Sequence, residues 1–138
     1  MPTYLLTGVA GFLGSHLAER LLAAGHRVRG VDCLRDYYSP ALKRFNLEGL
    51  VGQPSFENLE LDLATAELSP LLDGCDGVFH LAAQAGVRSS WGQEFHCYTR
   101  DNVLATQRLF EACRGRCLER VVYASSSSVY GDAQTLPT

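Results

Sequence analysis

The sequence predicts an α/β fold with a doubly wound parallel sheet, and three observations lead to this prediction. The chain has 138 residues, of which 46% are hydrophobic and 20% charged, as in an ordinary soluble domain. Short apolar runs of strand type alternate with segments of helical periodicity. A turn with three glycines, TGVAGFLG, follows the first run. Such alternation implies right-handed crossovers that cover both faces of a parallel sheet.

The first half of the chain shows this alternation clearly. Leu13, Leu17 and Leu21 recur at helical spacing, and Gly25 supplies a C-terminal stop. A polar stretch and then a run with a period of two follow. The expected elements are a strand over 4–6, a helix over 12–24, a strand over 27–31, a helix around 41–50 and a strand over 56–61.

The second half continues the pattern to a fifth strand. Its long amphipathic helix offers Val103, Leu109, Phe110 and Cys113 for an inner face. The expected elements are a helix over 67–72, a strand over 77–82, a helix over 101–113 and a strand over 120–124. Five strands of this kind predict the order 3-2-1-4-5, with a ligand crevice at the carboxyl ends of strands 1 and 4.

Charge and cysteine content exclude several classes of protein. The net charge is -3, from 12 basic and 15 acidic residues, so we expect no nucleic-acid partner. No apolar run approaches the roughly 20 residues of a membrane span, so we expect no membrane partner. The five cysteines are scattered and no export signal precedes them, which predicts reduced thiols, a cytoplasmic location and no metal site.

The glycine turn between the first strand and the first helix predicts dinucleotide binding. A phosphate needs backbone N–H groups at close range, and a helix N-terminus supplies them. Gly8 permits the tight turn, Gly11 the close passage of a pyrophosphate, and Gly14 the packing of the helix on the strand. The spacing G-x-x-G-x-x-G favours a Rossmann-type fold, and an ordinary glycine turn is the alternative.

Two acidic positions extend this prediction. Asp32 lies 18 residues after Gly14, where a carboxylate accepts hydrogen bonds from the adenosine ribose and repels a 2′-phosphate. NAD is therefore favoured over NADP, although the nearby Arg35 leaves NADP open. A strand-end aspartate that caps a turn is the alternative for Asp32. Asp62 and the following Leu63 suit either an adenine edge or a helix N-cap.

The last two strands end in polar loops that face the predicted crevice. His80 is expected to be a buried histidine with satisfied hydrogen bonds rather than an acid/base group. Gln84 and Arg88 follow on a loop where an arginine can clamp a phosphate or carboxylate. The serines 125–128 follow the fifth strand, where a hydroxyl can hydrogen-bond a reacting sugar oxygen. A solvated arginine and a serine-rich turn are the alternatives.

These motifs together resemble the extended short-chain dehydrogenase/reductase family. They are TGVAGFLG, Asp32, the pair Asp62–Leu63, HLAAQAGVR, Asn102 and SSSSVYG, and they cover nearly the whole chain in order. The resemblance is strongest to the NAD-dependent nucleotide-sugar epimerase/dehydratase branch. Residues 36–44 together with HLAAQAGVR look most like UDP-glucuronate 4-epimerases, and UDP-glucose 4-epimerases come next.

The resemblance implies a role for each matching residue. Ser126 matches the catalytic residue that bonds the sugar 4-oxygen. Gln84 and Arg88 lie on the loop expected to face the nucleotide-sugar substrate, which the resemblance implies is a UDP-sugar. Lys43 matches a second ribose contact, and Asn102 matches a helix residue that supports the active-site backbone. The residues assigned to NAD are Gly8, Gly11, Phe12, Leu13, Gly14, Asp32, Lys43, Asp62, Leu63, Leu81, Ala82, Ala83 and Asn102.

The chain departs from the family pattern at the catalytic base. Such enzymes use a Tyr-x-x-x-Lys pair, but Lys43 is the only lysine here and Tyr130 is followed at +4 by Gln134. We therefore expect residues 1–138 to be a partial NAD-binding domain, truncated before the last strands and the substrate domain. Alone it is expected to be inactive, and to self-associate or dimerise through its exposed surface.

The expected function is the NAD-binding part of a nucleotide-sugar 4-epimerase, which oxidises the sugar at C4, passes through a 4-keto sugar and returns the hydride. Two alternatives stay open. One is a 4,6-dehydratase or decarboxylase of the same family, which begins with the same oxidation. The other is a non-catalytic NAD-binding sensor module, which the missing Tyr–Lys pair fits.

Overall fold

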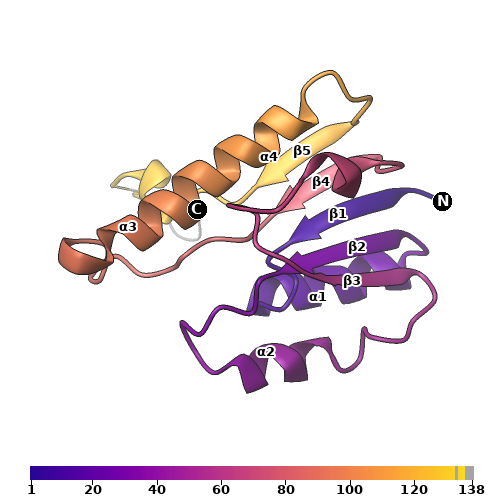
Figure 1. Cartoon of the computed structure of the whole chain (residues 1–138), viewed down its shortest axis with the longest axis horizontal. Coiled ribbons are helices and arrows are strands. Elements are labelled where there is room, and N and C mark those ends of the chain that lie inside the picture. The colour runs from indigo at the N-terminus through magenta and orange to yellow at the C-terminus, as the bar shows by residue number, and fades with distance from the viewer. Residues whose placement is uncertain (133, 136–138) are drawn as a thin grey trace.

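A single parallel sheet of five strands organises the computed structural model, which describes residues 1–132 and 134–135 (Figure 1). The strand order is β3-β2-β1-β4-β5, which confirms the expected order. The expected domain limit at residue 138 lies outside the described residues. The strands are β1 (Thr3–Thr7), β2 (Arg27–Asp32), β3 (Phe56–Glu60), β4 (Gly77–His80) and β5 (Arg120–Tyr123).

Helices connect the strands as expected, with two differences. The α-helices are α1 (Phe12–Ala23), α2 (Pro40–Leu47), α3 (Phe95–Tyr98) and α4 (Ala105–Cys113). The helix expected over 67–72 is only a 3₁₀ turn, Ser69–Leu72, because the segment is too short for an α-helix and Gly74, with φ +72°, ends it. The helix expected from residue 101 instead begins at Phe95, and a π-helical turn, Thr99–Leu104, joins α3 to α4.

Two hydrophobic cores cover the two faces of the sheet. Ala18 of α1 and Leu47 of α2 pack on one face, together with Leu6 of β1. Leu109 of α4 packs on the opposite face with Leu5 of β1. Figure 1 shows α1 and α2 beside the β1–β3 part of the sheet and α4 alongside β4 and β5. The central strand β1 is therefore covered on both sides, as the alternation of strands and helices predicts.

The prediction of which residues form the inner face of the long helix is partly wrong. Leu109 is fully buried, but Val103 is 65% exposed and Phe110 also lies at the surface. Val103 belongs to the π-helical turn, whose extra residue rotates the apolar stripe relative to a continuous α-helix, and Ala105 is buried instead. Beside this face, all four residues of β5 are exposed.

The register of the strands determines where a site can form. Thr7 at the end of β1 pairs with Val31 of β2 on one side and with His80 of β4 on the other. The three carboxyl ends therefore lie level along one edge of the sheet. The loops that follow β1, β2 and β4 leave from this edge, which is the expected position of a ligand crevice in an open parallel sheet.

Candidate functional site

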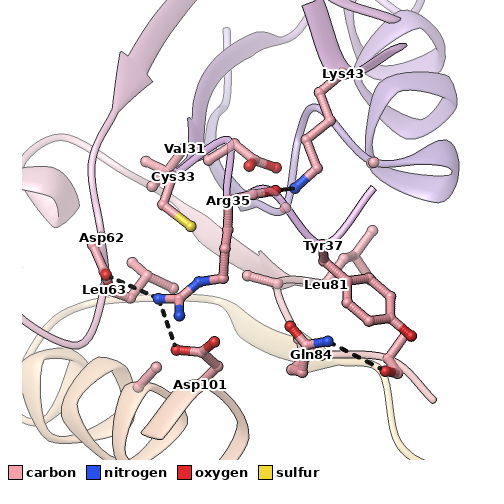
Figure 2. A pocket seen from close by; sticks show the side chains of 18 of the residues that line it. Val31, Cys33, Arg35, Tyr37, Lys43, Asp62, Leu63, Leu81, Gln84 and Asp101 are labelled. Carbon is pink, nitrogen blue, oxygen red and sulfur yellow. Dashed lines mark hydrogen bonds and ion pairs between the residues drawn. The ribbon is translucent and has the colours of Figure 1, made fainter. Parts of the chain in front are cut away.

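A cavity of about 570 Å³ lies at the carboxyl edge of the sheet (Figure 2). The glycine turn, the loops after β2, β3 and β4, and the start of α4 line it. It brings together twelve of the thirteen residues that the sequence assigns to a cofactor, and all but Asn102 are in its wall. The twelve are Gly8, Gly11, Phe12, Leu13, Gly14, Asp32, Lys43, Asp62, Leu63, Leu81, Ala82 and Ala83.

The glycine turn packs so closely that side chains have no room. Gly8 has φ +74°, and a Cβ added to it would lie 2.7 Å from the backbone nitrogen of Ala82. A Cβ on Gly14 would lie 2.0 Å from the carbonyl oxygen of Gly8. The start of α1 therefore sits directly on the turn, and its first N–H groups, which lack partners within the helix, lie at the cavity wall with Phe12 and Leu13.

The Asp32 carboxylate accepts hydrogen bonds from the backbone of two loops, the turn after β2 and the glycine turn. Its Oδ1 accepts the Leu34 N–H at 2.8 Å, so the carboxylate caps the turn after β2. Its Oδ2 accepts the Ala10 N–H at 3.2 Å and so reaches the glycine turn. The turn-capping alternative and a position in the cavity wall are therefore both realised by the same side chain.

Lys43 lies at the same end of the cavity and is buried. Its Nζ donates to the carbonyl oxygen of Arg35 at 2.9 Å and lies 4.8 Å from the centre of the Tyr38 ring. Burial raises the pKa of Tyr38, and the Asp32 carboxylate adds to this rise. The ammonium group is thus held by the loop after β2, and both Lys43 and Asp32 line the cavity.

Asp62 belongs to a network of two arginines and two aspartates. Arg35 lies 3.3 Å from Asp62 Oδ2 and 3.2 Å from Asp101 Oδ1, and Figure 2 shows its guanidinium directed at both carboxylates. Arg100 contacts the same two oxygens at 2.5 and 2.7 Å. Burial by itself would raise the pKa of Asp62, but hydrogen bonds from Arg100 and the Ala64 N–H, with the charges of Arg100 and Arg35, outweigh it and lower that pKa.

His80 is a buried histidine whose two ring nitrogens both have partners. Thr7 Oγ1 lies 2.7 Å from Nδ1, and Thr106 Oγ1 lies 2.8 Å from Nε2. Because Thr7 Oγ1 also accepts the Ala82 N–H at 3.2 Å, we assign the Thr7 hydroxyl proton to Nδ1 and a ring proton to Nε2. Burial lowers the pKa of His80, which favours this neutral form. The ring thus joins β1, β4 and α4.

Asn102 acts on the backbone of the loop after β4. Its Oδ1 accepts the Gln84 N–H at 2.7 Å, and its Nδ2 donates to the Gln84 carbonyl oxygen at 3.0 Å. Gln84 lines the cavity, whereas the Asn102 side chain lies behind it. Farther along this loop, the Tyr98 hydroxyl donates to the Ala85 carbonyl oxygen at 3.0 Å. The helix therefore holds the loop in place from behind.

Ser126 and Arg88 lie outside the wall of the cavity as the structure describes it. Ser126 is exposed, and its Oγ accepts the Ser128 N–H at 3.2 Å at the start of the 3₁₀ turn Ser127–Tyr130. From this part of the chain, Ala124 is the residue that reaches the cavity. Arg88 is exposed on the loop after β4. The structure thus gathers the expected cofactor residues and leaves two expected substrate residues at the surface.

Several residues in the wall were not assigned to a site by the sequence, and four of them carry polar side chains that could meet a ligand. Cys33, Tyr37 and Tyr38 lie on the loop after β2, and Asp101 lies at the π-helical turn. The loop residues follow directly on Asp32, so their position at a carboxyl end was a usable signal. Asp101 carried no such signal, because its place depends on a helical segment that begins six residues earlier than expected.

The described part of the chain contains neither a bilayer-spanning helix nor a cluster of metal ligands. None of its helices combines the length and the apolar character that crossing a bilayer requires. No group of three or more histidine, cysteine, aspartate or glutamate side chains in this part converges as a set of metal ligands.

Comparison with known proteins gives consistent matches over nearly the whole chain. The chain is 49% identical over 134 residues to a Bacillus subtilis protein described as an uncharacterized UDP-glucose epimerase, YtcB, covering 94% of this chain and 42% of that protein. It is 37% identical to a UDP-glucuronate 4-epimerase of Thermodesulfobacterium geofontis, covering 94% of this chain and 41% of that protein.

A solved structure agrees with these relatives. The UDP-glucuronic acid 4-epimerase of Bacillus cereus, in complex with UDP-glucuronic acid and NAD, superposes with a TM-score of 0.90 at 40% identity, covering 96% of this chain and 43% of that one. The present chain thus spans about two fifths of the length of these relatives. The family described as NAD dependent epimerase/dehydratase matches residues 4–138, and the chain belongs to this family.

Proposed function

We propose that this chain is the NAD-binding portion of a nucleotide-sugar 4-epimerase acting on UDP-sugars. The observation that carries the proposal is the cavity at the carboxyl edge, whose wall contains twelve residues that the sequence assigns to NAD. The Bacillus cereus epimerase, which superposes over 96% of this chain, was solved with NAD and UDP-glucuronic acid, and this supports the same cofactor and substrate class here.

Each part of NAD would have its own group of residues in the cavity wall. The first turn of α1, with Gly11 leaving its approach open, would hold the pyrophosphate through backbone N–H groups. Asp32 and Lys43 would bind the adenosine ribose, and Asp62 with Leu63 would bind the adenine. The backbone from Leu81 to Ala83 would pass under the nicotinamide-side ribose. Bound NAD would accept a hydride from the sugar C4 and return it to the opposite face of the 4-keto sugar.

The chain's own catalytic contribution would be the serine run after β5. We propose that Ser126 bonds the sugar 4-oxygen and that Gln84 and Arg88 contact the nucleotide sugar. A general base is still required for the 4-hydroxyl proton, and no tyrosine in the sequence has a lysine at +4. Because the relatives are more than twice as long, we propose that the base and a substrate domain come from a further segment, and that residues 1–138 form a partial domain of a cytoplasmic enzyme.

A non-catalytic NAD-binding module is a second candidate. The missing Tyr-x-x-x-Lys pair is the observation that favours it. The two candidates make the same prediction for NAD binding and opposite predictions for a chain that carries the additional segment. The dehydratase and decarboxylase alternatives would also oxidise the sugar C4 and differ from an epimerase only in their product.

The experiment uses a chain extended by the coding sequence that follows residue 138. It is incubated with NAD and either UDP-glucuronate or UDP-glucose, and the products are separated by chromatography. We expect the 4-epimer, and we expect Ser126→Ala to lower turnover with little effect on NAD affinity. Ser125→Ala is the matched control. A stop codon at this point, or no product from the extended chain, would favour the binding module, and greater damage from Ser125→Ala would shift the catalytic role by one residue.

A further inference from the structure

The cavity contains both of the signals that decide between NAD and NADP. In dinucleotide sites, a carboxylate at the end of the second strand favours NAD, and an arginine nearby accommodates the 2′-phosphate of NADP. Asp32 ends β2, and Arg35 follows three residues later in the wall of the same cavity. The residue types on this loop therefore leave the selectivity undecided, and the positions of the side chains must decide it.

The guanidinium of Arg35 is already occupied. It extends across the cavity to Asp62 after β3 and Asp101 at the π-helical turn, at 3.3 and 3.2 Å (Figure 2). The Asp101 side chain is only 15% exposed, so solvent screens this pair less than a pair on the open surface. If Arg35 left this pair, the largely buried Asp101 carboxylate would lose one of its two arginine partners, which is unfavourable.

The two carboxylates are themselves fixed. Arg100 contacts both, at 2.5 Å from Asp62 and 2.7 Å from Asp101, and the other oxygen of Asp62 accepts the Ala64 N–H at 2.9 Å. Two positive and two negative charges thus balance within one cluster. Neither aspartate can follow Arg35 if the arginine turns toward a ligand on the β2 side of the cavity.

From this arrangement we infer that Asp101, together with Asp62, selects NAD over NADP by holding Arg35 away from the 2′-phosphate. Asp32 would repel that phosphate. Arg35 is the cation on the same loop that could offset this repulsion, and its ion pairs with Asp62 and Asp101 would keep it from reaching the phosphate. Asp101 is thus a specificity-determining residue that acts through Arg35. The inference rests on the proposed NAD site and assigns its selectivity to residues of this chain.

Lys43 is the other cation in this part of the cavity. Its Nζ is bound to the carbonyl oxygen of Arg35 rather than to its side chain, and it contacts the Tyr38 ring. A substitution at Asp101 does not touch either interaction. Any attraction of Lys43 for a 2′-phosphate is therefore common to all the variants compared.

The test measures the ratio of the dissociation constants for NADP and NAD by calorimetry on the full chain at constant ionic strength. We expect Asp101→Asn to shift this ratio toward NADP by about tenfold, the value of one hydrogen bond to a charged group. Arg35→Gln added to Asp101→Asn should reverse the shift. Glu111→Gln is the matched control, because Glu111 pairs with Arg114 on the exposed part of the same helical segment, away from the cavity. It should leave the ratio unchanged.

Arg35→Gln in the unchanged background keeps the inference testable if Asp101→Asn fails to fold. We expect it to alter the ratio by less than about threefold, because Arg35 is not available to the phosphate. A tenfold loss of NADP binding relative to NAD would show that Arg35 already serves the phosphate and would overturn the inference. If a folded Asp101→Asn variant binds NAD and has the same ratio of NADP to NAD dissociation constants as the wild-type chain, the inference is also overturned. If the wild-type chain bound neither dinucleotide, the proposed function would fail together with the inference.

Discussion

The glycine turn after β1 and the serine turn after β5 lie at the same edge of one sheet, but they differ in how they are supported. Leu5, Leu6 and Thr7 of β1 are fully buried, as is Val9 of the turn that follows. All four residues of β5 are exposed, and so is Ser126 after it. The strand that leads into the proposed cofactor turn is thus buried in this chain, whereas the strand that leads into the proposed catalytic serine is exposed.

The strongest challenge to this comparison is an activity assay of the 138-residue chain. We expect no turnover of UDP-glucuronate or UDP-glucose in the presence of NAD. Losing a general base typically costs about 10²–10⁴-fold, and losing substrate positioning adds up to roughly 7–11 kcal/mol to the barrier. The measurement is chromatography for a 4-epimer together with absorbance for NADH. Clear turnover would mean that His80 or Tyr130 serves as base and that the serine side is already functional.

The packing of the glycine side can be tested at Gly14. Gly14→Ala should reduce the free energy of unfolding by at least about 3 kcal/mol, because the added Cβ would lie 2.0 Å from the Gly8 carbonyl oxygen. Gly49→Ala is the control, since a Cβ there meets no atom within 4 Å. Urea unfolding followed by circular dichroism measures both. Equal midpoints for the two variants would show that the turn is less rigid than described.

Asp32 tests the binding role of the same side. Asp32→Ala should weaken NAD binding by roughly 1–3 kcal/mol, because charge-assisted hydrogen bonds to the ribose are lost. Asp36→Ala removes the same charge from an exposed position of the same loop and serves as the control. Calorimetry compares the two variants, with circular dichroism to verify that both fold. An affinity for NAD that does not change in Asp32→Ala would contradict the ribose assignment.

The smallest expected effect is the pH dependence of stability that His80 causes. His80 lies on β4, between the strand before the glycine turn and the strand before the serine turn. Burial lowers its pKa below the ordinary 6.5, so between that value and the folded-state pKa the unfolded chain binds more protons than the folded chain. The titration of His80 therefore adds no pH dependence to the free energy of unfolding above pH 6.5, and it lowers that free energy as the pH falls further. Asp62, whose pKa is also lowered, contributes stability above its ordinary 3.8 that is lost only at more acidic pH.

Urea midpoints at pH 7.5, 6.5 and 5.5 isolate the contribution of His80. The decrease between pH 6.5 and 5.5 should be smaller in His80→Gln than in the wild-type chain, whatever the variant costs at pH 7.5. An identical decrease in both would show that the Thr7–His80–Thr106 contacts do not resist protonation.

The sequence predicted the strand order and most of the cavity, because both depend on local patterns. Strand–helix alternation determines the connections, and the glycine spacing with Asp32 marks the edge where loops meet. The π-helical turn at Thr99–Leu104 was not predictable from periodicity, and it displaced Val103 from the expected inner face. The pairing of Arg35 with Asp101 was also missed, since it joins residues 66 positions apart that share no repeating pattern. Self-association through the exposed β5 stays a prediction.

Hydrogen exchange of the 138-residue chain with and without NAD tests most directly whether the glycine turn and its neighbouring loops bind NAD without a further segment. We expect NAD to slow exchange in the glycine turn, in the loop from Asp32 to Arg35 and in the loop from Leu81 to Gln84. Exchange in β5 and in the serine turn should not change. Protection centred on residues 120–130, or no protection of the glycine turn at saturating NAD, would contradict the proposed division between the two turns.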